Sequence, residues 1–404
     1  MNLELLSPAG DPTKLKTAFN FGADAVYLGG KNFSLRAFSD NFDENELKNA
    51  VAYSHALNKK VYVTLNIFAK NADFFHLFDY VKFLYEIGVD AVIVSDPGVF
   101  SVCRKVAPNL DIHISTQANT LNKYSAAFWA ENGAKRIILA RELSLAEIKE
   151  IREFIPDNTE LETFCHGAMC ISYSGRCLLS DYFTGRSSNR GECVQACRWN
   201  YELRARGSDG EYYPIEQDDK GTYILNSKDL NMIDHIAEMA DAGITSFKIE
   251  GRMKSEYYVA TVVNAYRRAF DAYKKYGADY SLNRTFYNEL KKTGHRDFTT
   301  CFSIKNDDLT ENHFNSQSVG DRTFIATVLD YNTETKTATV EMRNRFFEGD
   351  ELELLTPGKY LNAKIVVKDL SDLDGNAVKD AKIVMQHLTF YCETPLLAGD
   401  ILRK

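Results

Sequence analysis

Four of the eight cysteines fall in one short stretch with the spacing C-x6-C-x15-C-x3-C, namely Cys170, Cys177, Cys193 and Cys197. Four thiolates are the donor set of a structural zinc ion or of an iron–sulfur cluster. Zinc sites usually pair cysteines roughly two to four residues apart, and only the last two approach that pattern, whereas a cluster accepts looser spacing. The spacing alone therefore leaves zinc and iron–sulfur open.

The other cysteines have a different interpretation. Cys103, Cys301 and Cys392 each stand alone in the sequence and are expected to be small buried side chains. Cys165 alternates with Phe164 in a strand-like run and is expected to belong to the core as well. Tyr182, Phe183 and Trp199 flank the four spaced cysteines, and we expect them to pack in the core rather than to stack on a ligand.

Charge and length limit the classes of function. The chain has 404 residues, a net charge of −8 and a pI of about 5.6, which argues against a general polyanion-binding surface but not against a local basic patch. The N-terminus carries no signal-peptide pattern, and no apolar run has the length of a membrane span. A cytoplasmic location is therefore predicted. Reduced cysteines are expected there, and this favours metal over disulfides.

One pattern recurs in the part of the chain that must position these cysteines. A helical stretch ends at glycine and a short apolar strand follows, at Gly22, Gly88, Gly133 and Gly243. Four more strand-like runs lie near Leu3, Lys60, Asp111 and Leu161. Eight strand–helix units predict a (β/α)8 TIM-like barrel, with the cysteine-rich stretch inserted after strand 7. An open doubly wound sheet is the alternative.

The barrel interpretation selects candidate site residues, because polar side chains at the carboxyl ends of barrel strands face the active site. These ends carry Ser7, Asn66, Asp96, Gln117, Arg141, His166, Lys248, Glu250 and Arg252. His166, Lys248 and Glu250 are the candidate catalytic residues. Arg141 and Arg252 have the chemistry to bind a carboxylate, although each would serve equally well in a rim salt bridge.

The last part of the chain changes character. Residues 1–280 are predicted to form the barrel, with the cysteine-rich segment at 162–225, and 281–318 to form a connector. Helices are expected at Ser227–Ala242 and Ser255–Lys275. Alternating strands from residue 319 to residue 404 predict a small C-terminal β-barrel.

The run E-x-F-x-H-G-A-M-C-x6-C-L-L-S at Glu162–Ser180 resembles the signature of peptidase family U32, the collagenase-like proteins. The continuation RSSNRGECVQACRWNY at Arg186–Tyr201, the opening ELLSPAGD and the run FGADAVYLGG are similar too. The resemblance covers nearly the whole chain and is nearest to the tRNA-hydroxylation branch of the family.

That resemblance implies a barrel carrying a four-iron–four-sulfur cluster, and it shifts the choice from zinc to iron–sulfur. It places the cluster ligands at the four spaced cysteines. Relatives that hydroxylate ubiquinone have their fourth cysteine further along, where this chain has Ile224–Lys228 without one, so Cys197 takes that role.

The resemblance also implies 5-hydroxylation of the wobble uridine of tRNA, with prephenate as the source of the hydroxyl group. Prephenate is a dicarboxylate, so cationic groups are expected to converge on it. The substrate-binding candidates are Arg36, Asn66, Gln117, Arg141 and Arg252. A paralogue or a second copy of the chain is a further possible partner.

Two other functions stay open. A peptidase of unknown catalytic mechanism is the alternative that the family name suggests, although no G-x-S-x-G elbow or H-E-x-x-H motif is present. A non-catalytic RNA-binding protein is the third class.

Overall fold

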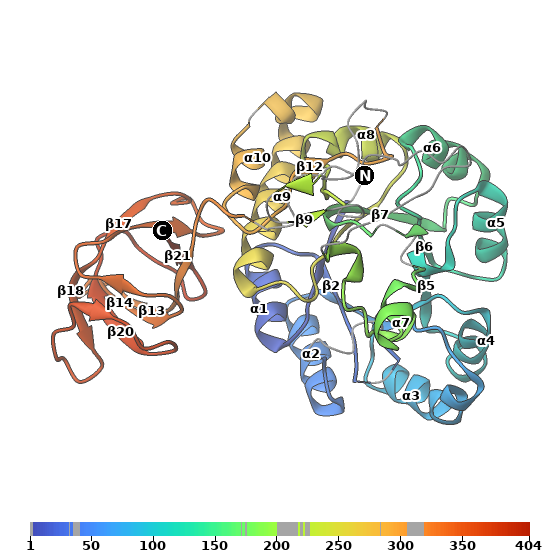
Figure 1. Ribbon diagram of the computed structural model, residues 1–404, viewed down its shortest axis with the longest axis horizontal. Coiled ribbons are helices and arrows are strands. Elements are labelled where there is room, and N and C mark those ends of the chain that lie inside the picture. Colours follow the sequence, from blue (N-terminus) through green and yellow to red (C-terminus); the bar gives the residue numbers. More distant parts are fainter. Residues whose placement is uncertain are drawn as a thin grey trace.

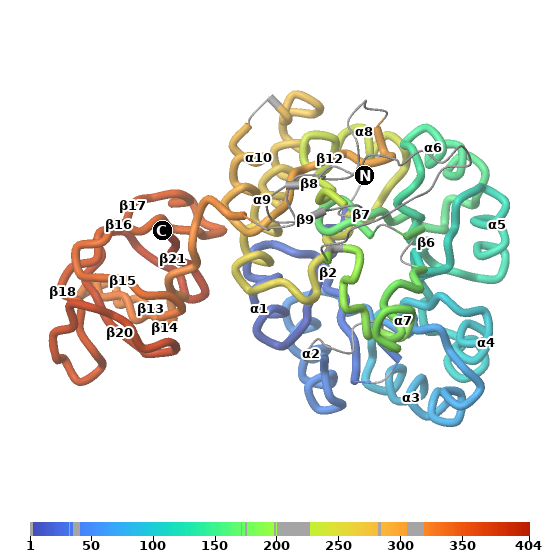
Figure 2. The backbone as a smooth tube through the Cα atoms, viewed as in Figure 1, coloured from blue at the N-terminus to red at the C-terminus, as the bar shows by residue number. Residues whose placement is uncertain are grey.

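The computed structural model describes residues 3–31, 33–34, 41–170, 172–173, 176–199, 217–218, 221–222, 227–282, 284–304 and 319–404. Arg36 and most of the stretch from 200 to 226 lie outside these residues, so the substrate-binding role predicted for Arg36 stays a prediction. Two units are visible in the trace of the chain, a ring of helices around a barrel and a smaller unit of strands beside it, coloured orange and red (Figure 2).

The first unit is a closed barrel of eight parallel strands. They are β1 (Glu4–Pro8), β2 (Ala25–Leu28), β3 (Lys60–Leu65), β4 (Ala91–Val94), β5 (Asp111–Ile114), β6 (Arg136–Ile138), β7 (Glu160–Ala168) and β11 (Ser246–Ile249). Strand β11 pairs in parallel with both β1 and β7, which closes the sheet. The predicted TIM-like barrel is therefore confirmed, and the open sheet is wrong.

Helices surround the barrel as expected from the repeated pattern (Figure 1). They are α1 (Pro12–Asn20), α2 (Glu44–Ala56), α3 (Phe74–Glu86), α4 (Pro97–Val106), α5 (Lys123–Glu131), α6 (Leu145–Phe154), α8 (Ile236–Asp241) and α9 (Glu256–Tyr276). Side chains cap several N-termini; Asp43, for example, forms a reciprocal capping box with Glu46. The four predicted glycines all have left-handed backbone, with φ from +80° at Gly88 to +107° at Gly22.

The helix predicted at Ser227–Ala242 is wrong in its first half. Residues Asp229–Asn231 form strand β10, which runs antiparallel to the end of β7 and also pairs with β12 (Phe298–Thr299). The cause is a buried ion pair, because the Asp229 carboxylate accepts hydrogen bonds from Arg296 Nη2 at 2.6 Å and from the Arg296 backbone N–H at 3.1 Å. This tertiary contact overrides the local helical pattern, and α8 begins only at Ile236.

The second unit is an antiparallel sheet in the order β17-β16-β21-β13-β14-β20-β18. Its strands are β13 (Phe324–Asn332), β14 (Thr337–Met342), β16 (Glu351–Leu355), β17 (Lys364–Val366), β18 (Lys368–Asp372), β20 (His387–Tyr391) and β21 (Ile401–Arg403). The two edge strands, β17 and β18, do not pair with each other by hydrogen bonds. Along the chain only Val367 separates them, so the sheet curls around its own apolar core. The predicted β-barrel thus takes the form of a half-barrel.

Buried polar contacts join the two units. Arg403 at the end of β21 is fully buried and donates to Glu353 Oε1 at 2.8 Å and to Asn362 Oδ1 at 2.7 Å. Its guanidinium also pairs with Glu289 of α10 (Thr285–Leu290). Within the described ranges, no helix is both long and apolar enough to cross a membrane.

A close approach between β7 and β11 shapes the carboxyl end of the barrel. Gly167 has φ +109°, and a Cβ added there would lie 2.5 Å from the Glu250 carbonyl oxygen. The Glu250 N–H in turn donates to the His166 carbonyl at 2.8 Å. Only glycine permits this contact, which sets the position of Glu250 at the strand end.

We therefore expect Gly167→Ala to lower the free energy of unfolding by about 3 kcal/mol, because left-handed strain adds to the cost of separating two strands. Gly88→Ala is the matched control: its φ is +80°, but the nearest atom to an added Cβ is 4.0 Å away. The control variant should be destabilised only by the left-handed backbone strain, which costs about 1–2 kcal/mol. Urea unfolding of both variants measures the difference, and equal losses would contradict the close approach.

Candidate functional site

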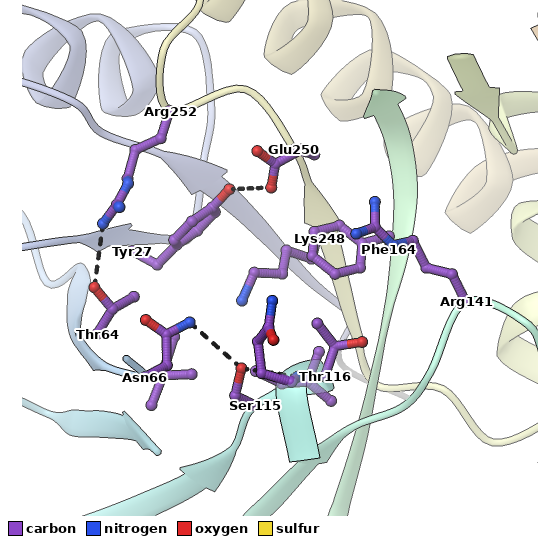
Figure 3. A pocket seen from close by; sticks show the side chains of 13 residues that line it. Tyr27, Thr64, Asn66, Ser115, Thr116, Arg141, Phe164, Lys248, Glu250 and Arg252 are labelled. Atoms are coloured by element: carbon purple, nitrogen blue, oxygen red, sulfur yellow. Dashed lines mark hydrogen bonds between the residues drawn. The ribbon is translucent and has the colours of Figure 1, made fainter. Parts of the chain in front are cut away.

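A pocket of about 80 Å³ lies at the carboxyl ends of the barrel strands (Figure 3). Six of the eight residues predicted to be catalytic or substrate-binding line it: Asn66, Gln117, Arg141, Lys248, Glu250 and Arg252. They lie at or shortly after the carboxyl ends of strands β3, β5, β6 and β11, which is the arrangement expected of a barrel active site. The structure thus brings together residues that lie up to 186 positions apart, from Asn66 to Arg252.

Lys248 extends into the middle of this pocket (Figure 3). Its Nζ lies 3.0 Å from Glu162 Oε1 and 4.3 Å from the centre of the Tyr27 ring. Glu162 is itself fully buried and also accepts from Arg136 Nη1 at 2.9 Å. The carboxylate and the ring face both favour a cation here, so the pocket presents a buried, positioned ammonium group.

Two guanidinium groups flank Lys248. Arg252 is only 3% exposed and donates from Nη1 to Thr64 Oγ1 at 3.1 Å. Arg141 lies over the Phe164 ring at 4.5 Å and donates to the Ala168 carbonyl at 2.9 Å. Among the described residues, the pocket lining therefore combines three basic side chains with one carboxylate, Glu250, which accepts from Tyr27 Oη at 3.3 Å. Such a lining favours an anion, and arginine binds carboxylates bidentately.

Three buried polar atoms of the lining have no hydrogen-bond partner among the described residues: Asn66 Oδ1, Thr116 Oγ1 and Gln117 Oε1. A buried acceptor without a donor costs about 1–3 kcal/mol. Asn66 is oriented by a weak bond from Nδ2 to Ser115 Oγ at 3.5 Å. These atoms are therefore available to a polar ligand, whose donors would satisfy them.

The four spaced cysteines line a second, larger cavity of about 410 Å³. Gln117, Arg141 and Glu250 line both this cavity and the pocket, so the two share a wall. The cysteine-rich segment leaves the end of β7, and its helix α7 (Leu179–Thr184) lies inside the ring of barrel helices rather than in it (Figure 1).

Polar contacts tie this segment to the opposite side of the barrel. Arg190, in the short helix η4 (Ser188–Arg190), binds the Asp73 carboxylate with two hydrogen bonds of 2.8 and 2.9 Å and also donates to the Phe68 carbonyl at 2.7 Å. The bonds from Arg190 hold the pKa of Asp73 below its usual value. Arg176 donates through Nε and Nη2 to the Gln117 carbonyl, at 3.1 and 2.9 Å. The segment is thus anchored at the loops after β3 and β5.

The sulfur atoms have polar surroundings that suit thiolates. The Leu179 N–H donates to Cys177 Sγ at 3.4 Å, and Ser180 Oγ lies 3.9 Å from Cys193 Sγ as a donor. All four side chains are partly exposed, unlike the buried Cys103, Cys165, Cys301 and Cys392, which are core residues as predicted. Across the residues that the structure describes, no three or more His, Cys, Asp or Glu side chains are gathered for one metal ion. The four spaced cysteines instead line the larger cavity.

His166, a predicted catalytic residue, does not line the pocket. It is 2% exposed and packs against the rings of Tyr258, Tyr266 and Phe298, with centroids 5.6–6.1 Å away. The cause is a bulge: Lys248 pairs with Phe164, but the next residue, Ile249, pairs with His166. The extra residue reverses the alternation of β7, so His166 points toward α9. Burial lowers the pKa of His166 to about 3, which keeps the ring neutral.

Five polar or aromatic residues of the pocket were not among the predicted site residues: Tyr27, Thr64, Ser115, Thr116 and Phe164. Ser115 and Thr116 were accessible to sequence reasoning, because they form a polar run directly after the apolar strand β5. Tyr27 and Phe164 carry no such signal, since aromatic residues inside strands usually pack in the core.

Comparisons with known proteins show which family this chain matches. The model of the family described as peptidase family U32 matches residues 10–313, and that of the peptidase family U32 C-terminal domain matches residues 321–403. The Bacillus subtilis (strain 168) protein named tRNA hydroxylation protein P1 is 40% identical over 403 residues, 99% of this chain and 94% of the relative. The Escherichia coli (strain K12) protein named tRNA hydroxylation protein P is 38% identical and covers 89% of this chain and 87% of its own length.

A more distant relative is named for a different RNA. The Escherichia coli (strain K12) protein named 23S rRNA 5-hydroxycytidine C2501 synthase is 37% identical over 306 residues. That match covers 74% of this chain but only 45% of the relative.

The position of His166 generates a prediction about acid stability. The unfolded chain takes up a proton at this ring below about pH 6.5, whereas the folded chain does so only near pH 3. The folded state therefore loses stability as the pH falls between these values, by about 1.4 kcal/mol per unit. Between pH 6.5 and about pH 5, the free energy of unfolding of His166→Gln should therefore fall by about 2 kcal/mol less than that of the parent protein, as measured by urea unfolding.

The exposed His76 on α3 provides the control, and His76→Gln should leave the slope of stability against pH unchanged. The slope is the decisive quantity, because replacing a packed ring also lowers stability by a constant amount at every pH. An identical slope in His166→Gln and the parent protein would show that the ring is protonated in the folded state.

Proposed function

Because the chain belongs to peptidase family U32 and carries the C-terminal domain of that family, we propose that it is an enzyme that hydroxylates tRNA. The modified position is C5 of the wobble uridine, and prephenate supplies the hydroxyl group. The observation that carries the proposal is the cationic pocket that shares a wall with the cysteine-lined cavity. The names of the relatives that match most of the chain support the reaction class.

The charge of the pocket supports a dicarboxylate co-substrate. Lys248, Arg141 and Arg252 line it together with Glu250, and Glu162 pairs with Lys248, so these five side chains carry a formal balance of one positive charge. Prephenate carries two carboxylates, and the two guanidinium groups, Arg141 and Arg252, would bind them. The low exposure of Lys248 and Arg252, 4% and 3%, strengthens their attraction for an anion because little water screens them.

The amide groups of the wall support a nucleobase as the second ligand. Asn66 and Gln117 each combine an unsatisfied buried acceptor with an amide donor. A uracil edge offers the complementary N–H and carbonyl groups. The wobble base lies in a single-stranded loop, where proteins read bases by stacking and by hydrogen bonds to their edges. These two side chains would orient the base at the wall shared by the pocket and the cavity.

The common cavity of the four cysteines supports an iron–sulfur cluster. Among the described residues the four thiols line one space of about 410 Å³, and in a cluster four thiolates around such a space ligate different iron atoms. A single zinc ion, with all four sulfurs about 2.3 Å from one point, is the alternative. Cys170, Cys177, Cys193 and Cys197 would hold the cluster, which would supply electron-transfer or Lewis-acid chemistry beside the pocket.

A peptidase mechanism has less support at this site. The neighbouring pair Cys165 and His166 is buried, and burial raises the pKa of the Cys165 thiol well above its usual value. A buried thiol beside a neutral ring is not an activated nucleophile. Cleavage of gelatin by the purified protein, abolished by Glu250→Ala, would favour the peptidase over the hydroxylase.

The first test is mass spectrometry of tRNA nucleosides. A strain without this gene and without a paralogue should lack 5-hydroxyuridine in bulk tRNA, and the wild-type gene should restore it. A gene with Arg141→Met should restore at least about 10-fold less 5-hydroxyuridine than the wild-type gene, because a hydrogen bond to a charged group contributes about 1.5–3 kcal/mol. Arg284→Met is the control, since Arg284 is exposed and pairs with Asp234 outside the pocket. Normal 5-hydroxyuridine in the deletion strain would refute the proposal.

The second test is the metal content of protein purified without oxygen. The parent should be brown and contain iron and acid-labile sulfide, and Cys177→Ser should lose most of both. Cys392→Ala is the matched control, because Cys392 lies buried in the C-terminal sheet and should not affect iron. Stoichiometric zinc without sulfide would contradict the cluster while leaving the tRNA test unaffected.

A further inference from the structure

Three aromatic side chains of the cysteine-rich segment lie on the surface. Tyr182 and Phe183 belong to α7, and Trp199 follows the short helix η5 (Ala196–Arg198). Their exposed fractions are 83%, 46% and 41%. The expectation that they pack in the core is therefore wrong. We call these three residues the aromatic platform.

The platform is contiguous. The rings of Tyr182 and Phe183 meet edge to face with centroids 5.2 Å apart, and those of Phe183 and Trp199 are tilted with centroids 6.2 Å apart. Burying one aromatic side chain of this size stabilises a protein by about 1.5–3 kcal/mol. Because these three rings are exposed in large part, the folded chain lacks much of that stabilisation. Contiguous exposed apolar side chains of this kind are typical of interaction sites.

The elements that carry the platform also form the wall of the cysteine-lined cavity. Leu179 and Ser180 of α7 line that cavity, as do Ala196 and Cys197 of η5. The cavity in turn shares Gln117, Arg141 and Glu250 with the pocket. The platform is therefore carried by the two short helices that form part of the cavity wall, and its own three side chains lie outside the lining. A nucleotide bound in the pocket would have its chain neighbours near these helices.

The surroundings of the platform suit a nucleic acid strand. Arg186, three residues after Phe183 in the chain, is exposed, so a basic group accompanies the rings although the whole chain carries a net charge of −8. Asp181 on α7 is the exposed acidic neighbour. Proteins that bind single strands combine basic groups for the phosphates with aromatic rings on which successive bases stack.

We propose that the aromatic platform stacks unpaired bases of RNA next to the nucleotide that enters the pocket. The proposal rests on the proposed function, since it takes the RNA substrate as the occupant. It assigns recognition of the single-stranded loop to α7 and η5 rather than to the C-terminal sheet. Stacking is tolerant of base identity, so the platform holds the loop while the pocket selects the base.

The two tryptophans of the chain make a direct measurement feasible. Trp129 is only 9% exposed and Trp199 is 41% exposed. In a Trp129→Phe background, Trp199 is the only fluorophore of its kind, and a stacked base should quench it. The probes are single-stranded oligouridine RNA and an oligomer of the same length without bases. Oligouridine should quench the fluorescence of Trp199. It should also bind at least about 10-fold more tightly than the oligomer without bases, because each stacked base contributes roughly 1–3 kcal/mol.

Variants of Tyr182 separate stacking from general charge attraction. Tyr182→Leu in the same background should weaken oligouridine binding by about 5-fold or more and leave the oligomer without bases unaffected. Tyr182→Phe keeps a ring and should bind like the parent. Tyr182 is 83% exposed, so neither change should impair folding. Equal binding of the two oligomers, or no response to the loss of the ring, would overturn the platform.

The outcomes for platform and reaction are distinguishable. Quenching by oligouridine in a protein whose deletion leaves 5-hydroxyuridine intact would retain the platform and refute the hydroxylation. Loss of 5-hydroxyuridine on deletion, together with no quenching, would refute the platform and retain the hydroxylation.

Discussion

The candidate site depends on a fully buried carboxylate in the middle of the barrel. Glu162 on β7 accepts from Lys248 on one side and from Arg136 on the other, at 3.0 and 2.9 Å. Arg136 also binds Glu4 and Glu160, at 2.5 and 2.6 Å. Burial, the largest influence, would raise the pKa of Glu4, but the Arg136 charge together with hydrogen bonds from Arg136, Tyr62 and Ser246 outweighs it and leaves that pKa below its usual value. Ions in a barrel interior persist only in such paired arrangements, since an unpaired buried charge is strongly unfavourable.

This network explains how an acidic chain presents a cationic pocket. The excess of carboxylates lies on the outer surface, where water screens it, whereas Lys248 and Arg252 are nearly buried at the strand ends. Glu162 compensates Lys248, so the guanidinium groups of Arg141 and Arg252 carry the attraction of the pocket for anions despite a net charge of −8. Whole-chain charge therefore describes long-range behaviour and says little about this site.

Sequence reasoning identified the parts of the fold that local rules determine. Glycine at a helix end followed by an apolar strand is such a rule, and it located the barrel and thereby six residues of the pocket. Sequence reasoning failed where a tertiary contact changed the local pattern. The bulge beside Lys248 turned His166 away from the pocket, and the bond between Asp229 and Arg296 replaced the start of a helix with β10. The exposure of Tyr182 was equally hidden, because a sequence does not show which face of a short helix meets the barrel.

The cysteine-rich segment and the pocket are mechanically coupled as well as adjacent. Arg141 reaches from the pocket to the Ala168 carbonyl, where the segment begins, and Arg176 reaches from the segment to the Gln117 carbonyl. Both Arg141 and Gln117 belong to the wall between pocket and cavity. A group bound by the cysteines would order the segment and, through these two bonds, the side chains that meet the substrate. The cysteines therefore matter to the pocket even if the bound group takes no direct part in the chemistry, because positioning within a fraction of an ångström governs the rate of such reactions.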